Sequence, residues 1–114
     1  MNHPKHLPHA DSLIVEEDKL TGYLLNLAHR VGGPKAKYFR NRGFIVENWQ
    51  GMAAALREHG KTQPVSSSST TAHGSKFEVQ CQIVTPDGTN PCIVTAWIQE
   101  GGKPPRLVTA YPNR

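Results

Sequence analysis

A cationic segment from Lys19 to Phe44 holds the side chains of this chain that are best suited to chemistry. It surrounds a Gly-Gly-Pro turn, and no aspartate or glutamate occurs between Lys19 and Val46. Uncompensated positive charge of this kind suits an anionic ligand, of which phosphate is the commonest. The alternative is a solvated helix face whose charges keep the protein soluble. The cations and the histidine of this segment are Lys19, His29, Arg30, Lys35, Lys37, Arg40 and Arg42.

His29 is the titratable residue with the strongest case for catalysis. We expect it at the end of a helix beside Arg30, with Lys35 just beyond the glycine turn. An imidazole can take up or release a proton near neutral pH, and a lysine can stabilise the negative charge of a phosphate. A histidine at a helix C-terminus can also act only through its electrostatic effect on the helix. Both interpretations of His29 stay open at this point.

A second group of candidate residues lies in the last two predicted strands. Strand alternation places Val94, Ala96 and Ile98 on one purely apolar side. If that side meets the helices, hydroxyl and aromatic side chains of both strands lie together on the open face of the sheet. Arg106 falls at the strand mouth, where a guanidinium can bind phosphate through two hydrogen bonds. The residues expected on the open face are Thr95, Trp97, Thr109 and Tyr111, all of which are also ordinary strand formers.

The elements that must position these side chains follow from periodicity and turn signals. Apolar residues at helical spacing predict about three N-terminal helices, and period-two alternation around a Pro-Asp-Gly-Thr turn predicts a hairpin. A Ser/Thr-rich segment, 63–73, is either a polar strand or an exposed loop. The predicted fold is α+β, with the helices packed on one face of a three- to four-stranded antiparallel sheet. The predicted helices span about 17–29, 34–41 and 47–59, and the strands 76–85, 92–99 and 106–111.

Length and charge set limits on the molecule. The chain has 114 residues, which suits a single domain, and we expect residues 12–114 to form it after a flexible arm at 1–11. The arm contains His3, His6 and His9, but two prolines prevent a shared helix face for a metal ion. A net charge of +4 suits a local anionic site better than wrapped duplex DNA.

Compartment and cofactors are inferred from what the sequence lacks. It has neither the apolar core of a signal peptide nor an apolar run long enough to span a membrane, so we expect a cytoplasmic protein without membrane contact. Cys81 and Cys92 are expected as two reduced thiols, with a disulfide across the hairpin as the alternative. No zinc-binding, P-loop or nucleophile-elbow motif occurs, and therefore no metal or cofactor is expected.

Several of these residues together resemble an uncharacterised bacterial domain family of small stand-alone proteins and toxin C-termini. Its pattern has a Lys-Leu pair at a helix start, then Tyr-Leu-Leu-Asn, His, Gly-x-x-Lys-Ala and Phe, and it closes on Arg-Leu-Val-Thr-x-Tyr. The likeness runs from Leu7 to Pro112. The matching positions are Lys19, Leu20, Tyr23 to Asn26, His29, Gly32, Lys35, Ala36, Phe39, Arg106 to Thr109 and Tyr111.

The order of helices before strands and the closing Thr-Ala-Tyr-Pro also resemble, more distantly, the barnase-like, EndoU-like and RelE-like ribonuclease toxins. This resemblance implies a toxin-like, metal-independent ribonuclease that acts on RNA and is restrained by an acidic cognate inhibitor protein. His29 would be the base or acid, and Lys35 and Arg106 would hold the phosphate charge. The implied catalytic residues are His29, Lys35, Arg106, Thr109 and Tyr111, and the implied substrate-binding residues are Lys37, Arg40, Thr95 and Trp97.

Two other functions fit the same residues. The basic surface can bind RNA or a protein without any reaction, in which case binding would depend steeply on salt and no cleavage product would form. The chain can also be the partner or inhibitor protein itself, with its helices and open sheet forming a protein interface.

Overall fold

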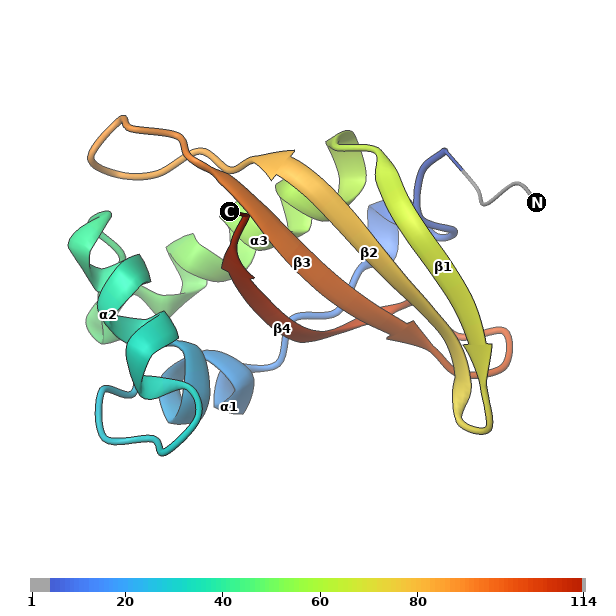
Figure 1. Cartoon of the computed structure of the whole chain (residues 1–114), viewed down its shortest axis with the longest axis horizontal. Coiled ribbons are helices and arrows are strands. Elements are labelled where there is room, and N and C mark those ends of the chain that lie inside the picture. Colours follow the sequence, from blue (N-terminus) through green and yellow to red (C-terminus); the bar gives the residue numbers. More distant parts are fainter. Residues whose placement is uncertain (1–4, 114) are drawn as a thin grey trace.

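The computed structural model describes residues 5–113 and has an α+β fold, in which helices are followed by a four-stranded antiparallel sheet (Figure 1). This confirms the predicted class and the order of the elements. Helix α1 is continued directly by a π-helical turn, η2, and short 3₁₀ turns precede α1 and α3. The helical elements are η1 (Ala10–Ser12), α1 (Glu17–Lys19), η2 (Leu20–Leu24), α2 (Gly33–Asn41), η3 (Val46–Asn48) and α3 (Trp49–Thr62).

The sheet is a simple meander in which each strand pairs with its neighbour in sequence. The Ser/Thr-rich segment forms an edge strand, β1, so the strand alternative for this segment is the correct one. At the other edge, Ile14 makes a short parallel bridge with Arg106 at the start of the last strand. The strands are β1 (Val65–Thr71), β2 (Gly74–Gln82), β3 (Cys92–Gln99) and β4 (Arg106–Pro112).

The sheet face that meets α3 carries Thr95 and Trp97, both of which are 0% exposed. Gly60 of α3 lies so close that a Cβ built there would be 2.7 Å from Trp97 Cζ2. The prediction that Thr95 and Trp97 lie on an open face is therefore wrong. Burial of an indole removes far more apolar surface from water than burial of Ala96 on the opposite side, and this difference decides which side faces the helix.

A β-bulge in β4 reverses the side-chain alternation between the two ends of that strand. Trp97 pairs with Leu107, whereas the adjacent Ala96 pairs with Thr109, so Val108 is an extra residue. Because directly paired residues share a face, Thr109 points to the side of the sheet opposite Trp97. The four residues expected on one face are therefore divided. Thr95 and Trp97 lie on one side of the sheet, and Thr109 and Tyr111 lie on the other.

The helices contact the sheet in two places. Helix α3 runs along the Trp97 side, behind the sheet in the view of Figure 1, while α1 and α2 lie beside β4. Side chains of η2 and α2 reach Thr109. The prediction that all helices pack on one face is not confirmed.

His59 links α3 to the sheet through a buried polar network. It is 2% exposed, and its Nε2 donates a hydrogen bond to the carbonyl oxygen of Cys81 at 2.9 Å. Its Nδ1 lies 3.0 Å from Thr95 Oγ1, which also accepts a hydrogen bond from Trp97 Nε1 at 2.8 Å. Burial lowers the pKa of His59, although hydrogen bonds to the backbone oppose this effect. The network therefore favours a neutral imidazole in the folded protein.

Two further expectations concern the ends of the sheet. Cys81 and Cys92 form a disulfide between β2 and β3, which corrects the expectation of two reduced thiols.

Within the segment expected to be a flexible arm, Leu7 is 4% exposed and the carbonyl of Lys5 accepts a hydrogen bond from the Val65 N–H at 2.9 Å. Residues 1–4, including His3, lie outside the described residues. Within residues 5–113 no helix has the length and apolar character needed to cross a lipid bilayer.

The buried His59 predicts a loss of stability in mild acid. Its pKa in the folded state lies below the value of about 6.5 in the unfolded chain, so the unfolded state binds more protons as the pH falls through about 6.5. We expect the free energy of unfolding, measured with urea, to decrease from pH 7.5 to pH 5. His59→Gln should weaken this dependence, whereas the exposed His73→Gln should preserve it. Equal slopes in all three proteins would contradict the assignment.

Candidate functional site

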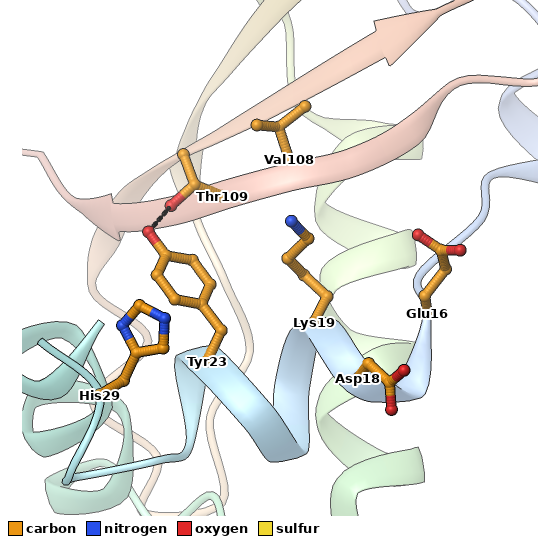
Figure 2. Close-up of a pocket in the computed structure, with 7 residues that line it drawn as sticks. All are labelled: Glu16, Asp18, Lys19, Tyr23, His29, Val108 and Thr109. Atoms are coloured by element: carbon orange, nitrogen blue, oxygen red, sulfur yellow. Dashed lines mark hydrogen bonds between the residues drawn. The ribbon is translucent and has the colours of Figure 1, made fainter. Parts of the chain in front are cut away.

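A cavity of about 590 Å³ opens between the first helical segment and β4 (Figure 2). Its lining combines carboxylates at one end with an imidazole at the other, and a phenol, an ammonium and a hydroxyl lie between them. This volume is within the range of ordinary small-molecule sites. The lining residues are Glu16, Asp18, Lys19, Tyr23, His29, Val108 and Thr109.

Three polar groups from three separate elements meet beside this cavity. Lys35 Nζ on α2 donates hydrogen bonds to Tyr23 Oη on η2 at 2.7 Å and to Thr109 Oγ1 on β4 at 3.1 Å. The two hydroxyl oxygens lie 3.0 Å apart, and either can donate to the other. The structure thus brings together Lys35 and Thr109, both expected from the sequence, and adds Tyr23.

Tyr23 is not among the candidate site residues identified from the sequence, so its part in the site was missed. Its neighbours Leu20 and Leu24 are 0% exposed, so the apolar stripe of this segment is real, but Tyr23 itself is only half-buried. A partly buried tyrosine hydroxyl usually needs a polar partner. That requirement is the signal by which the sequence could have identified it.

Local backbone geometry fixes the ring of Tyr23. The amide of Leu25 donates to the carbonyl of Leu20 at 2.7 Å, which closes a π-helical turn around this position. Behind the ring, a Cβ on Gly32 would lie 2.7 Å from Tyr23 Cε1. Only glycine fits there without displacing the ring, and the Gly-Gly-Pro turn is therefore a packing requirement of the site as well as the start of α2.

His29 stands edge-on to Tyr23, with the ring centroids 4.9 Å apart and an interplanar angle of 74°. Its Nδ1 accepts hydrogen bonds from the backbone N–H groups of Val31 at 3.1 Å and Gly32 at 2.9 Å. An N–H group can only donate, so Nδ1 carries no proton and the neutral ring is protonated on Nε2. Among residues 5–113, Nε2 has no hydrogen-bond partner, and it is the ring nitrogen left for a ligand.

The surrounding charges change the acidity of Tyr23. Burial raises its pKa, but hydrogen bonds from Lys35 and Thr109 and the charges of Lys35 and Lys19 outweigh that effect, and the pKa is lowered. The two ammonium groups lie 5.3 and 5.6 Å from the centroid of the Tyr23 ring. These cations favour the phenolate form of Tyr23.

Tyr111 also lies near Lys35, but its surroundings change its pKa in the opposite direction from that of Tyr23. The Lys35 ammonium lies 5.7 Å from its ring centroid, and Tyr111 Oη donates a hydrogen bond to Glu78 Oε2 at 3.3 Å. Burial raises the pKa of Tyr111, and the Glu78 carboxylate raises it further. Tyr111 thus contacts the cluster through its ring, and its hydroxyl is engaged elsewhere.

The remaining candidates do not join the cluster. Arg106 is paired with Glu100, with Nη2 and Oε1 3.2 Å apart, and it does not line the cavity. Lys37 and Arg40 are exposed on α2 and also lie outside the lining. Buried Thr95 and Trp97 contact α3 and cannot touch a ligand in this cavity. Within residues 5–113, no group of three or more histidine, cysteine, aspartate or glutamate side chains is arranged to hold a metal ion.

The family model that describes a domain of unknown function, DUF6883, matches residues 6–114. The chain belongs to this family. The assignment agrees with the sequence resemblance to an uncharacterised domain, and the family description names no activity. No curated protein matches the chain significantly.

The fold has a counterpart among solved structures. It is similar to a chain of a contact-dependent growth inhibition toxin–immunity protein complex from Klebsiella pneumoniae 342, with a TM-score of 0.70 and 13% sequence identity. The match covers 88% of this chain and 99% of that chain. At this identity the likeness shows a shared fold.

The cluster predicts unequal phenol acidities that can be measured directly. We expect Tyr23 to titrate below the ordinary tyrosine value of about 10 and Tyr111 to titrate above it. Lys35→Met keeps the apolar stem but removes the charge and the hydrogen bonds, so the pKa of Tyr23 should rise. Lys37→Met, on the exposed side of α2, should leave it unchanged. The measurement is NMR titration of ¹³Cζ-labelled tyrosine, and an unmoved Tyr23 in Lys35→Met would contradict the prediction.

Proposed function

We propose that this protein is a toxin-like ribonuclease that cleaves RNA phosphodiesters in the cavity beside Tyr23, using its own side chains rather than a resident metal ion. The observation that carries the proposal is the convergence of Tyr23, Lys35 and Thr109 beside that cavity, with Tyr23 and Thr109 in its lining. The fold it shares with a chain of a toxin–immunity protein complex supports a toxin- or immunity-related role.

The cavity offers the groups that cleavage by a neighbouring 2′-hydroxyl requires. Such a reaction needs a proton acceptor, positive charge and hydrogen-bond donors around the pentavalent phosphate, and a proton for the leaving 5′-oxygen. Lys19 lines the cavity and supplies a positive charge, and Nε2 of His29 supplies an N–H donor. Tyr23 and Thr109 supply hydroxyl groups at the same place.

Cations outside the cavity have a more distant role in this proposal. Lys37 and Arg40 are exposed on α2, where they would attract the RNA backbone in a salt-dependent way. Arg106 would contribute to phosphate binding only after release from Glu100. An acidic cognate inhibitor protein would cover the same positive surface.

A second candidate function is a protein-binding role on the immunity side of such a system. A groove of about 540 Å³ lies between α3 and the segment after β2, and it is lined mostly by apolar side chains. Two of its residues, Ile45 and Val84, are 46% and 69% exposed, which favours contact with another protein. In that case the protein would bind a toxin and would not cleave RNA.

RNA cleavage by purified protein tests the main proposal. Wild type and Lys35→Ala are incubated with end-labelled transfer RNA and messenger RNA, and growth is followed after induced expression in a bacterium. Because Lys35 holds Tyr23 and Thr109 in place, its loss should reduce the cleavage rate by about 10²-fold or more. The control Lys103→Ala removes an exposed ammonium in the turn between β3 and β4, outside the cavity lining, and should cleave within a few-fold of wild type. Absence of cleavage by wild type, or equal cleavage by Lys35→Ala, would reject the proposal.

A further inference from the structure

The hydrogen bonds around His29 restrict the part that this residue can take in the reaction. We propose that Tyr23, and not His29, accepts the proton from the attacking hydroxyl, and that His29 is a fixed N–H donor to the phosphate. This inference rests on the proposed ribonuclease function. It differs from the expectation drawn from the sequence, in which His29 is the base or the acid.

A catalytic base needs a free lone pair, and neither nitrogen of His29 offers one. The lone pair of Nδ1 already accepts the N–H groups of Val31 and Gly32. For Nε2 to have a lone pair, the neutral ring would have to carry its proton on Nδ1, facing those two N–H groups. Both hydrogen bonds would then be lost, and three N–H donors would face one another without an acceptor, which is unfavourable.

The same geometry argues against His29 as the acid. A doubly protonated imidazole carries a proton on both nitrogens, so it too would place an N–H on Nδ1 against the two backbone N–H groups. The form that fits is the neutral ring with its proton on Nε2. Since His29 lines the cavity and Nδ1 is occupied by the backbone, Nε2–H is available to a phosphate oxygen.

Tyr23 has the features that His29 lacks. The phenol oxygen of Tyr23 accepts a hydrogen bond from the Lys35 ammonium at 2.7 Å. Lys35 itself is not among the residues that line the cavity. Lys35 therefore acts through Tyr23, as a positioning residue that stabilises negative charge on the phenol oxygen. The pKa of Tyr23 is lowered, because these cationic contacts outweigh the effect of burial.

Thr109 accommodates both protonation states of Tyr23. The two oxygens are 3.0 Å apart and either can be the donor. When Tyr23 is a neutral phenol its O–H donates to Thr109, and when it is a phenolate the Thr109 hydroxyl donates to Tyr23. Gain or loss of a proton on Tyr23 is thus compatible with the same Tyr23–Thr109 hydrogen bond.

The proton balance of the step is closed. The 2′ O–H bond breaks, and its proton forms a new O–H bond on the Tyr23 phenolate. The 2′-oxygen then bonds to phosphorus, the P–O5′ bond breaks, and the departing 5′-oxygen takes a proton from a water molecule. The hydroxide left by that water removes the proton from Tyr23 and restores the phenolate. The products are a 2′,3′-cyclic phosphate and a 5′-hydroxyl.

Single-turnover cleavage of an RNA oligonucleotide by matched variants tests this assignment. Tyr23→Phe removes one oxygen atom but keeps the ring that packs against Gly32 and His29, so the fold should survive and the rate should fall at least 10²-fold. Tyr38→Phe, a half-buried tyrosine on α2 whose ring contacts Phe39 and Arg42, is the control and should keep the wild-type rate. Far-ultraviolet circular dichroism and the melting temperature confirm folding of each variant.

His29→Gln separates the donor role from the base role. Glutamine offers N–H donors but cannot exchange a proton at neutral pH, so we expect a loss of no more than about tenfold, against 10²–10⁴-fold for removal of a base. Added imidazole should not rescue His29→Ala. At pH values below the pKa of Tyr23, the wild-type rate should rise with pH as the phenolate fraction of Tyr23 increases, above a background measured without protein.

The outcomes distinguish this inference from the function on which it rests. No cleavage by wild type would reject the function. Cleavage that survives in Tyr23→Phe, cleavage that is lost in His29→Gln, or rescue of His29→Ala by imidazole would keep the function and overturn the assignment. The tautomer has a test that needs no activity: ¹⁵N NMR should show His29 protonated on Nε2 and bare on Nδ1, and the reverse pattern would also overturn it.

Discussion

The site depends on one ammonium group shared between two hydroxyls. Lys35 is half-buried, and its Nζ bonds both Tyr23 and Thr109, which come from elements separated by more than half of the chain. A charged group in that position is satisfied only while η2, α2 and β4 keep their relative places. The same contact therefore orients the hydroxyls and ties the helical segment to the edge of the sheet.

The two sides of the sheet have different roles: one packs against α3 and stabilises the fold, and the other carries the candidate site. On one side, Trp97 packs on Gly60 and the His59 network joins α3 to β2 and β3. On the other, the bulge at Val108 turns Thr109 toward Tyr23. A bulge is a common way for a sheet to re-aim a side chain next to a functional site. Here it allows β4 to serve the core through Leu107 and Ala110 and the site through Thr109.

The sequence predicted the coarse fold because its local signals agree with one another. Helical spacing, the Pro-Asp-Gly-Thr turn and alternating strands gave the correct elements and their order. The family resemblance grouped His29, Lys35 and Thr109 as catalytic residues. In the structure Lys35 donates a hydrogen bond to Thr109, and His29 packs against Tyr23.

What the sequence could not predict depends on packing and on contacts between distant residues. Alternation alone cannot decide between two apolar strand faces, and it fails across a bulge, so Thr95 and Trp97 were assigned to the wrong side. The pairing of Arg106 with Glu100 follows from a tertiary contact that leaves no local pattern. For Tyr23 the sequence indicates only that its hydroxyl needs a polar partner, and the tertiary structure identifies that partner as Lys35. The tautomer of His29 likewise depends on how the backbone turns at Val31 and Gly32.

The most direct test of this account is the structure of the protein with a short RNA whose attacking 2′-hydroxyl is replaced by hydrogen, which permits binding without cleavage. The account predicts the scissile phosphate in the cavity, within hydrogen-bond distance of His29 Nε2 and with the vacant 2′ position facing Tyr23 Oη. A phosphate bound over Lys37 and Arg40 with the cavity empty, or RNA seated in the apolar groove beside Val84, would contradict it.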